Sequence, residues 1–295
     1  MRDLTDASAS ALATERGRVA REGLGSEILA RQGSDGSWRR AHAPVWLPTL
    51  FTLLLLRATG AGRTEPAVES AVARLESSLR WDDRAGWWDL RPTEFGAPFF
   101  EGEVEPCING RTLTLGTYFH QNVDGVATRL LGEQLEDGGW NCEAENGSVR
   151  SSFATTINVL EGLLAHEHAT GGSAESIAAR RRGEEYLLER RLFRRRSTGE
   201  VVNPEWLQFS FPIRWHYDVL RALEYFRSVG DAPDPRVDEA IDLLRAKRQP
   251  DGVWLLENTH PGRIHFALED GDNRPSRWNT LRAMRVLDWH ENSTD

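Results

Sequence analysis

Polar, ionisable and aromatic side chains gather at the starts of five apolar segments with helical spacing. They are Trp46, Cys107, Asn109, Arg111, Ser151, Ser152, Trp215, His216, Asp218, Trp278 and Asn279. The first turn of a helix leaves backbone N–H groups free and carries the positive end of the helix dipole, so these positions favour an anionic ligand. We expect His216 or Asp218 to be the acid–base group and Arg111 the contact to an anion. The alternative is that these residues cap helices and pack.

The aromatic members of this set predict the walls of a cavity. Trp46, Trp215 and Trp278 would line it, because aromatic rings stabilise cations and pack against prenyl chains. Asn109, Arg111 and Asn279 would hold the polar head of the ligand, since an apolar wall with a few convergent polar groups is typical of a small-molecule site.

Two other function classes remain open at this point. Aromatic walls also stack on sugars, and an enzyme that hydrolyses or cleaves polysaccharides would use paired acids. Its candidate carboxylates are Glu143, Glu205 and Asp218. The third class is a non-catalytic ring that binds a partner protein or a small ligand.

Composition narrows these classes. The chain has 295 residues and a net charge of −9, which argues against non-specific nucleic-acid binding. No apolar run reaches the roughly 18–20 residues that a membrane span needs, and the N-terminus has no apolar signal core. Cys107 and Cys142 are the two cysteines, too few for a disulfide framework. We therefore expect a soluble cytoplasmic protein; the sequence does not predict its oligomeric state.

A repeated turn organises the chain around these candidate residues. Its clearest copies are 31–38, 133–140 and 248–254, in which Gln32, Gln134 or Gln249 is followed by Asp, Gly and Trp; weaker copies end at Trp88 and Trp206. Asp and Gly favour the turn, and the tryptophan has a large apolar area to bury over it. We therefore expect the glutamines and tryptophans of the three clear copies to be structural. Successive copies are separated by enough residues for two helices.

Each turn is followed by an apolar helix and then by a more polar one. The apolar helices start near residues 46, 106, 153, 212 and 275, and the amphipathic ones include 65–79, 173–191 and 235–248. A helical hairpin of this kind cannot bury its apolar face alone, so neighbouring hairpins must stack. We predict an all-α fold, an α/α toroid of five to six hairpins, as one domain over residues 1–295. A single N-terminal helix at about 8–31 would close the ring.

The Gln, Asp-Gly and Trp units resemble the QW motifs of squalene–hopene and oxidosqualene cyclases, and also the turns of protein prenyltransferase β-subunits. The resemblance covers roughly residues 28–290 and implies the α/α toroid fold. It further implies a terpenoid cyclase-like or prenyltransferase-like enzyme with an isoprenoid-type substrate in the central cavity. The chain lacks the Asp-x-Asp-Asp acid of the cyclases, and Glu101, Glu103 and Glu105 form an acidic cluster that offers either a proton donor or a solvated loop.

The prenyltransferase resemblance also implies a zinc site. That family binds zinc through Asp-x-Cys at one helix start and a histidine at another, and Glu105-Pro106-Cys107 is an acid-x-Cys variant of this pattern. His216 would complete the ligand set, and carboxylate, thiolate and imidazole are ordinary zinc ligands. Cys142 is either an added ligand or a packing residue.

The segment 257–266 is expected to be a loop that overhangs the mouth of the cavity. It carries His260 and His265, to which the sequence assigns no role. Long loops in compact folds are often functional.

Overall fold

The computed structural model describes residues 7–39, 46–78, 80–81, 97–260 and 266–292, and it is mostly helical. Its α-helices are α1 (Ala9–Val19), α2 (Gly23–Leu29), α3 (Trp46–Thr59), α4 (Pro66–Ser78), α5 (Pro106–Tyr118), α6 (Asp124–Gly132), α7 (Phe153–Thr170), α8 (Ala174–Leu188), α9 (Val219–Val229), α10 (Asp238–Ala246) and α11 (Arg277–Asn292). Two short antiparallel ribbons accompany them: β1 (Arg80–Trp81) with β2 (Ala97–Pro98), and β3 (Trp254–Leu256) with β4 (Arg274–Ser276). The expected helical character is confirmed.

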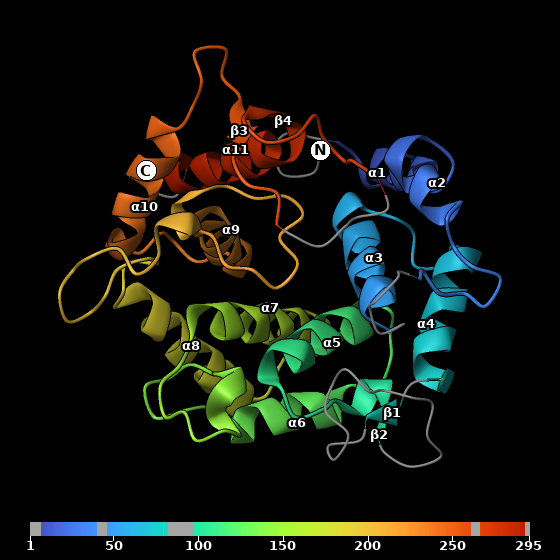
Figure 1. The fold of residues 1–295 in the computed structure, drawn as a ribbon, viewed down its shortest axis with the longest axis horizontal. Helices are drawn as coiled ribbons and strands as arrows, with labels where there is room; N and C mark the ends of the chain where they lie inside the picture. Colours follow the sequence, from blue (N-terminus) through green and yellow to red (C-terminus); the bar gives the residue numbers. More distant parts are fainter. Residues whose placement is uncertain (1–6, 40–45, 79, 82–96, 261–265, 293–295) are drawn as a thin grey trace.

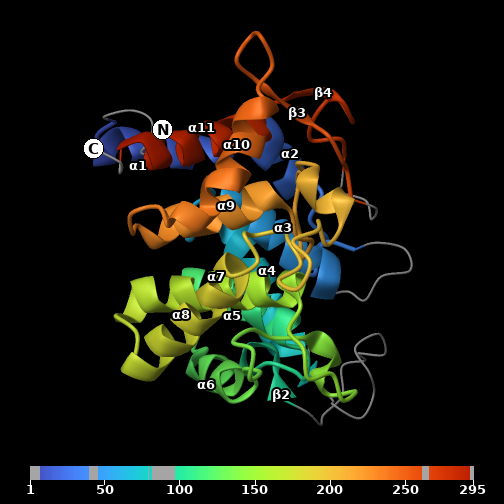
Figure 2. The same cartoon turned by 90° about the vertical axis from the view of Figure 1, so that its left-hand side faces the viewer.

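The helices follow one another in two layers. Helix α3 packs on α5, α5 on α7, α7 on α9 and α9 on α11, while α4, α6, α8 and α10 each pack against the helix that precedes them in the chain. Figure 1 shows the first series around the middle of the molecule and the second series outside it. In both views the first helices, α1 and α2, lie at the same end of the molecule as α11 (Figures 1 and 2). Closure of the ring into a toroid stays a prediction.

The N-terminal segment differs from the single helix expected over about 8–31. It forms α1 and α2, separated by a sharp turn at which Gly23 has a φ of +58°. The turn brings the next helix against the end of the first, because a Cβ on Gly25 would lie 2.0 Å from the carbonyl oxygen of Val19. Glycine at these two positions therefore ends one helix and starts the next.

Short polar residues begin the later helices, and glycine ends two of them. The side chains of Ser152, Ser173 and Asp218 accept hydrogen bonds from the backbone in the first turns of α7, α8 and α9. Gly171 and Gly230 end α7 and α9 in the left-handed conformation, each with a φ of 87°. These caps satisfy backbone groups that a helix end leaves free, and they set where each helix starts and stops.

The repeated turns share one hydrogen-bonding pattern. The indole Nε1 of Trp38, Trp140 and Trp254 donates to the carbonyl ten residues earlier, at 2.9, 2.7 and 2.8 Å. All three indoles are buried, and the backbone N–H of each donates to a threonine hydroxyl on the next inner helix. The tryptophans therefore join consecutive helices, and their predicted structural role is confirmed.

The glutamines of the repeat are less uniform. Gln32 and Gln134 each donate to the carbonyl four residues later and to a carbonyl of the next outer helix, Ala67 or Ala179. Gln249 instead donates to the carbonyl of Lys247. The copy that ends at Trp88 lies outside the described residues.

Helices α5 and α7 approach each other at the backbone. A Cβ on Gly110 would lie 2.3 Å from the carbonyl oxygen of Asn158, and one on Gly162 would lie 2.6 Å from that of Gly110. Only glycine permits this approach, which brings the side chains of Arg111 and Glu161 together.

One cluster of buried apolar side chains extends through the described chain from Ile28 to Val286. The assignment of the entire chain to one domain remains an expectation. In the part of the chain that the structure describes, no helix has the length and apolar character needed to cross a bilayer.

Candidate functional site

A cavity of about 790 Å³ is bounded mainly by α3, α5, α7, α9, α11 and the segment 211–216. This volume is in the range of pockets that bind small molecules. One part of its wall is apolar and another is densely charged.

The apolar part comes from α3 and the segment before α9. Leu47, Phe51, Leu54 and Leu55 lie on α3, and the ring of Phe51 meets that of Trp215 edge to face with centroids 4.5 Å apart. The apolar sequence of α3 leaves side chains on both sides of the helix, one side in the core and the other towards the cavity. Trp215, which the sequence predicts in an aromatic wall, is one of the residues that line the cavity here.

The charged part is centred on Glu161 of α7. Its carboxylate accepts hydrogen bonds from Arg111 of α5 and from Nε and Nη2 of Arg221 of α9, the latter at 2.8 and 2.9 Å. Arg221 also donates to the carbonyl of His216 at 2.6 Å and to Asn158 Oδ1 at 2.9 Å. Three inner helices therefore meet at one carboxylate.

The charges in this group shift each other's pKa. Burial alone would raise the pKa of Glu161, but Arg111, Arg221 and Arg57 lower it to about 2, so this carboxylate is ionised at neutral pH. Burial, together with repulsion from Arg221, lowers the pKa of Arg111 to about 9 despite the attraction of Glu161. Burial also lowers the pKa of Arg57. The site thus carries more positive charge than its own carboxylate balances.

A second carboxylate lies on α9. Glu224 accepts a hydrogen bond from Arg282 Nε at 2.7 Å and lies 3.8 Å from Arg285. Among the described residues that line the cavity, eight are arginine and two are glutamate, so the lining has a strong excess of positive charge. Buried Arg111 Nε and Arg282 Nη2 have no hydrogen-bond partner. An anionic group in the cavity would meet both excess charge and unused donors.

Three of the predicted site residues, Arg111, Trp215 and His216, line this cavity. The imidazole of His216 stacks on that of His260, with centroids 3.7 Å apart and planes at 14°. Burial, then Arg214 and Arg221, lower the pKa of His216, so its ring is neutral at pH 7. Burial and the neighbouring His216 lower the pKa of His260 to about 4. His265 lies outside the described residues.

Three predicted polar residues hold the backbone instead of lining the cavity. Asp218 is buried and accepts hydrogen bonds from the backbone of Arg221 and Ser210 at 2.7 and 3.2 Å. Asn109 exchanges hydrogen bonds with the backbone of Glu103, and Asn279 donates to the carbonyls of Phe209 and Leu255. Their position favours the alternative that helix-start residues cap and pack.

The other two tryptophans also lie behind the wall. Trp46 is fully buried and meets Trp81 edge to face, with centroids 5.1 Å apart. Trp278 stacks on Phe211, which itself lines the cavity, with centroids 4.9 Å apart. Neither indole is part of the described lining; Trp278 supports it through Phe211, whereas the ring contacts of Trp46 are with Trp81 and Phe99 in the core.

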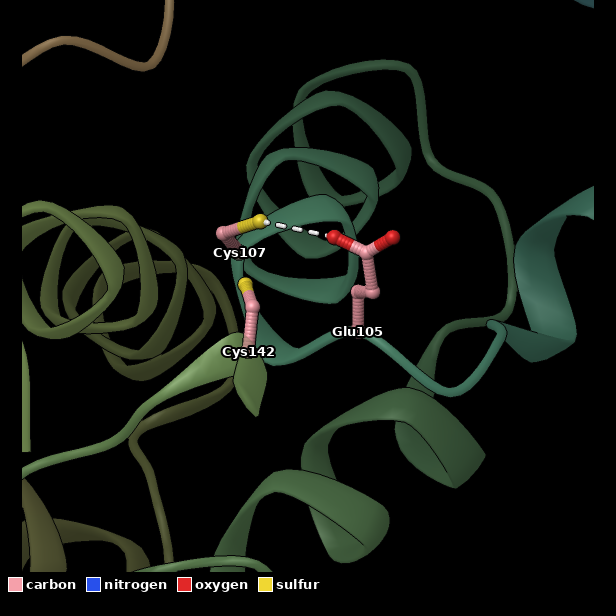
Figure 3. A group of neighbouring side chains, drawn as sticks. All are labelled: Glu105, Cys107 and Cys142. Carbon is pink, nitrogen blue, oxygen red and sulfur yellow. Dashed lines mark hydrogen bonds between the residues drawn. The ribbon is translucent and has the colours of Figure 1, made fainter. Parts of the chain in front are cut away.

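The predicted metal ligands are brought together in part. Glu105 and Cys107 lie at the start of α5, and the structure groups them with Cys142, whereas His216 lines the cavity. Figure 3 shows the two thiols and the carboxylate pointing towards one another. The three residues of the acidic cluster differ in their exposure to solvent. Glu101 is exposed, Glu103 is buried and Glu105 is half-buried.

The carboxylates proposed for polysaccharide cleavage are not gathered around the cavity. Glu143 and Glu205 are exposed on short 3-10 turns, Cys142–Ala144 and Pro204–Leu207, while Asp218 is buried as a helix cap. None of the three belongs to the described lining. The described residues thus do not bring the three candidate carboxylates together at the cavity.

Sequence reasoning missed most of the charged wall: Arg57, Glu161, Arg221, Glu224 and Arg282. All of them lie within inner helices, and all but Arg221, which is in the first turn of α9, lie more than one turn after the helix start. The sequence did contain one signal for these residues, a single charged residue within an apolar helix, such as Glu161 between Leu160 and Leu163. Such a charge indicates a buried ion pair, because charged side chains are rarely buried unless they are paired.

Comparisons with known proteins give distant likenesses. No family model matches the chain, and no curated protein matches it. A protein from Actinoplanes of solved structure is 14% identical, with 95% of this chain and 88% of the other covered and a TM-score of 0.46. The type II terpene cyclase MstE from Scytonema is 16% identical, with 97% and 82% covered and a TM-score of 0.46. A variant of that cyclase bound to its substrate geranylgeranyl dihydroxybenzoate is 16% identical, with 95% and 80% covered and a TM-score of 0.42. No family follows from likenesses at this level.

Proposed function

We propose that the cavity binds an isoprenoid-type amphiphile with an anionic head group, in a terpenoid cyclase-like or prenyltransferase-like enzyme. The observation that carries the proposal is the division of the wall into an apolar part around Phe51 and Trp215 and an arginine-rich part around Glu161. An apolar ligand alone would leave the arginines without use, and a small inorganic anion would leave most of the cavity unfilled.

The head group would lie at the arginines. Arg57, Arg111 and Arg282 line the cavity on three different helices, and Arg111 and Arg282 each retain an unused buried donor. Guanidinium groups bind carboxylate and phosphate oxygens through charge-assisted hydrogen bonds, which strengthen in a site of low dielectric. The chain of the ligand would lie against Leu54, Leu55 and the aromatic pair.

His216 would be the acid–base group. Its ring is neutral at pH 7, so it is suited to accept a proton, whereas Glu161 is already ionised and Glu224 is paired with Arg282. Both carboxylates of the described wall are paired with arginines, and a neighbouring positive charge disfavours the neutral acid that would protonate an alkene. This observation favours a second candidate function, a protein that binds the same ligand without converting it.

We also propose that the helical series closes into an α/α toroid. The guanidinium carbon of Arg31, just after α2, lies 4.6 Å from the ring centre of Phe266, which precedes α11, and this contact supports closure. A cytoplasmic location is likewise a proposal, supported by the free thiols of Cys107 and Cys142.

The test of the binding proposal is a thermal-shift series with three probes. Geranylgeranyl diphosphate should stabilise the protein, geranylgeraniol should stabilise it less, and an acidic oligosaccharide should have no effect. A ligand at a hundred times its dissociation constant adds about 2.7 kcal/mol to the free energy of unfolding, which is easily detected. Stabilisation by the oligosaccharide alone would overturn the proposal. Mass spectrometry of the bound lipid after incubation then separates an enzyme from a binding protein.

A further inference from the structure

Glu105, Cys107 and Cys142 form a compact group of potential metal ligands. One ligand atom from each lies within 4.8 Å of the other two, and Cys107 Sγ is 3.6 Å from Glu105 Oε2. The three residues come from two separate segments, the start of α5 and the 3-10 turn η2 (Cys142–Ala144) that precedes α7. Figure 3 shows both sulfur atoms and the carboxylate directed into the space between these segments.

One separation within the group equals that between two ligands of a tetrahedral ion. Zinc binds thiolate sulfur at about 2.3 Å and carboxylate oxygen at about 2.0–2.2 Å, so two ligand atoms around one ion are separated by roughly 3.5–3.8 Å. The separation of 3.6 Å between Cys107 Sγ and Glu105 Oε2 falls in this interval. Three protein ligands leave the fourth position to water.

Hydrogen bonds hold two of the three residues, Cys142 and Glu105, in place. The backbone N–H of Cys142 donates to Thr155 Oγ1 at 3.3 Å, and that hydroxyl lies 3.5 Å from Cys142 Sγ. On the other segment, the backbone N–H of Glu105 donates to Glu103 Oε1 at 2.9 Å. Such contacts around the ligands fix their orientation before an ion binds.

Acidic side chains surround the group. Glu103 is only 3% exposed and accepts the backbone hydrogen bond of Glu105, and Glu143 and Glu145 lie near the Glu105 carboxyl. A metal ion binds the deprotonated forms of its ligands, so a cation here would favour the thiolate forms of the cysteines.

We propose that Glu105, Cys107 and Cys142 bind one zinc ion that fastens the start of α5 to the turn before α7. Two thiolates favour zinc over magnesium or calcium, which prefer oxygen ligands. None of the three residues belongs to the described lining of the cavity, so the ion has a structural role. This proposal is independent of the ligand proposed for the cavity.

The first test measures metal content in protein purified without chelator and supplied with zinc. We expect one zinc per chain in the native protein and in the His216→Asn control, and less than a tenth of that in Cys107→Ser and Cys142→Ser. Glu105→Gln should weaken zinc binding at least tenfold while leaving both thiols in place. Circular dichroism checks that each variant is folded.

The second test uses cobalt(II) as the probe and does not depend on stability. Added to the metal-free protein, cobalt should produce thiolate charge-transfer absorption and the visible bands of a tetrahedral site, both reduced in Glu105→Gln. Zinc should slow the reaction of the two thiols with a disulfide reagent at least tenfold, and chelator should restore it. Native protein with no stoichiometric zinc, a cobalt spectrum unchanged by Cys142→Ser, or a mass two hydrogens lower from a Cys107–Cys142 disulfide would each overturn the proposal.

Discussion

Arg221 donates Nε and Nη2 to the two carboxylate oxygens of Glu161, at 2.8 and 2.9 Å, and the guanidinium is almost fully buried. Glu161 also pairs with Arg111, so one carboxylate holds two arginines from two helices. This arrangement fixes where the arginines lie in the cavity wall. Because two arginines share one carboxylate, the group of three side chains keeps one unbalanced positive charge, which an anionic ligand can neutralise.

Glu161→Gln should strongly destabilise the protein. The substitution keeps the shape of the side chain but leaves buried Arg111 and Arg221 without their shared counter-charge. Removing one partner of a buried ion pair costs about 3–5 kcal/mol. Unfolding in urea measures the loss. The matched control is Glu185→Gln, which removes an exposed pair with Arg236 and should change stability by about 1 kcal/mol or less. Equal losses of stability in the two variants would contradict the role of Glu161 as the shared counter-charge of the buried arginines.

Trp140→Phe should show that the repeated tryptophans join helices. The change removes the donor to the carbonyl of Leu130 and leaves that buried oxygen unpaired, besides a small void. We expect a loss of about 2–4 kcal/mol in the free energy of unfolding. Trp289→Phe is the control, because its indole donates to the carbonyl of Asp231 at an exposed site. A control that loses as much stability would show that tryptophan area, not the buried bond, matters.

The stacked histidines should make stability fall in acid. Burial and His216 lower the pKa of His260 to about 4, below the unfolded value near 6.5. Folding therefore favours the neutral ring: its contribution is complete above about pH 6.5 and is lost as the pH falls through about 4. The titratable or charged groups that face the His260 ring are His216, Arg214 and Arg221.

The measurement is urea unfolding of wild type and His260→Gln at pH 7 and pH 4. The wild type should lose about 1–3 kcal/mol more than the variant over this interval. His168→Gln, at an exposed position, should behave as wild type. Parallel losses in wild type and His260→Gln would show that other groups cause the acid sensitivity.

The helical series was predictable from sequence because its signals are local. Apolar periodicity, Asp-Gly turns and spaced tryptophans gave the inner helices to within a few residues at the starts of α3, α5 and α7. The break between α1 and α2 was missed because it depends on Gly25 packing on the carbonyl of Val19, a contact that periodicity does not encode.

The site was predicted only in part, for a related reason. A helix start identifies where free N–H groups lie, but Asp218 and Asn279 use those positions to hold backbone. The carboxylates of the lining, Glu161 and Glu224, lie further along their helices. Which side of an inner helix faces the cavity depends on crossings such as Gly110 on Gly162. Pairing of Glu161 with Arg221, sixty residues later, follows from that packing.

Arg57→Gln should separate ligand binding from stability. Arg57 lines the cavity from α3, burial lowers its pKa, and Glu161 compensates only in part, so the folded protein holds this charge at a cost. Its removal should therefore leave stability unchanged or slightly higher.

Binding of geranylgeranyl diphosphate to Arg57→Gln should weaken about 10–100-fold, because a charge-assisted contact worth about 1.5–3 kcal/mol is lost. Geranylgeraniol has no anionic head, so its dissociation constants for wild type and variant should agree within about twofold, which is well under 1.4 kcal/mol. Arg150→Gln, an exposed arginine outside the described lining, is the matched control for net charge. Calorimetric titration with both lipids gives the four affinities, and equal weakening for diphosphate and alcohol would place the head group elsewhere in the cavity.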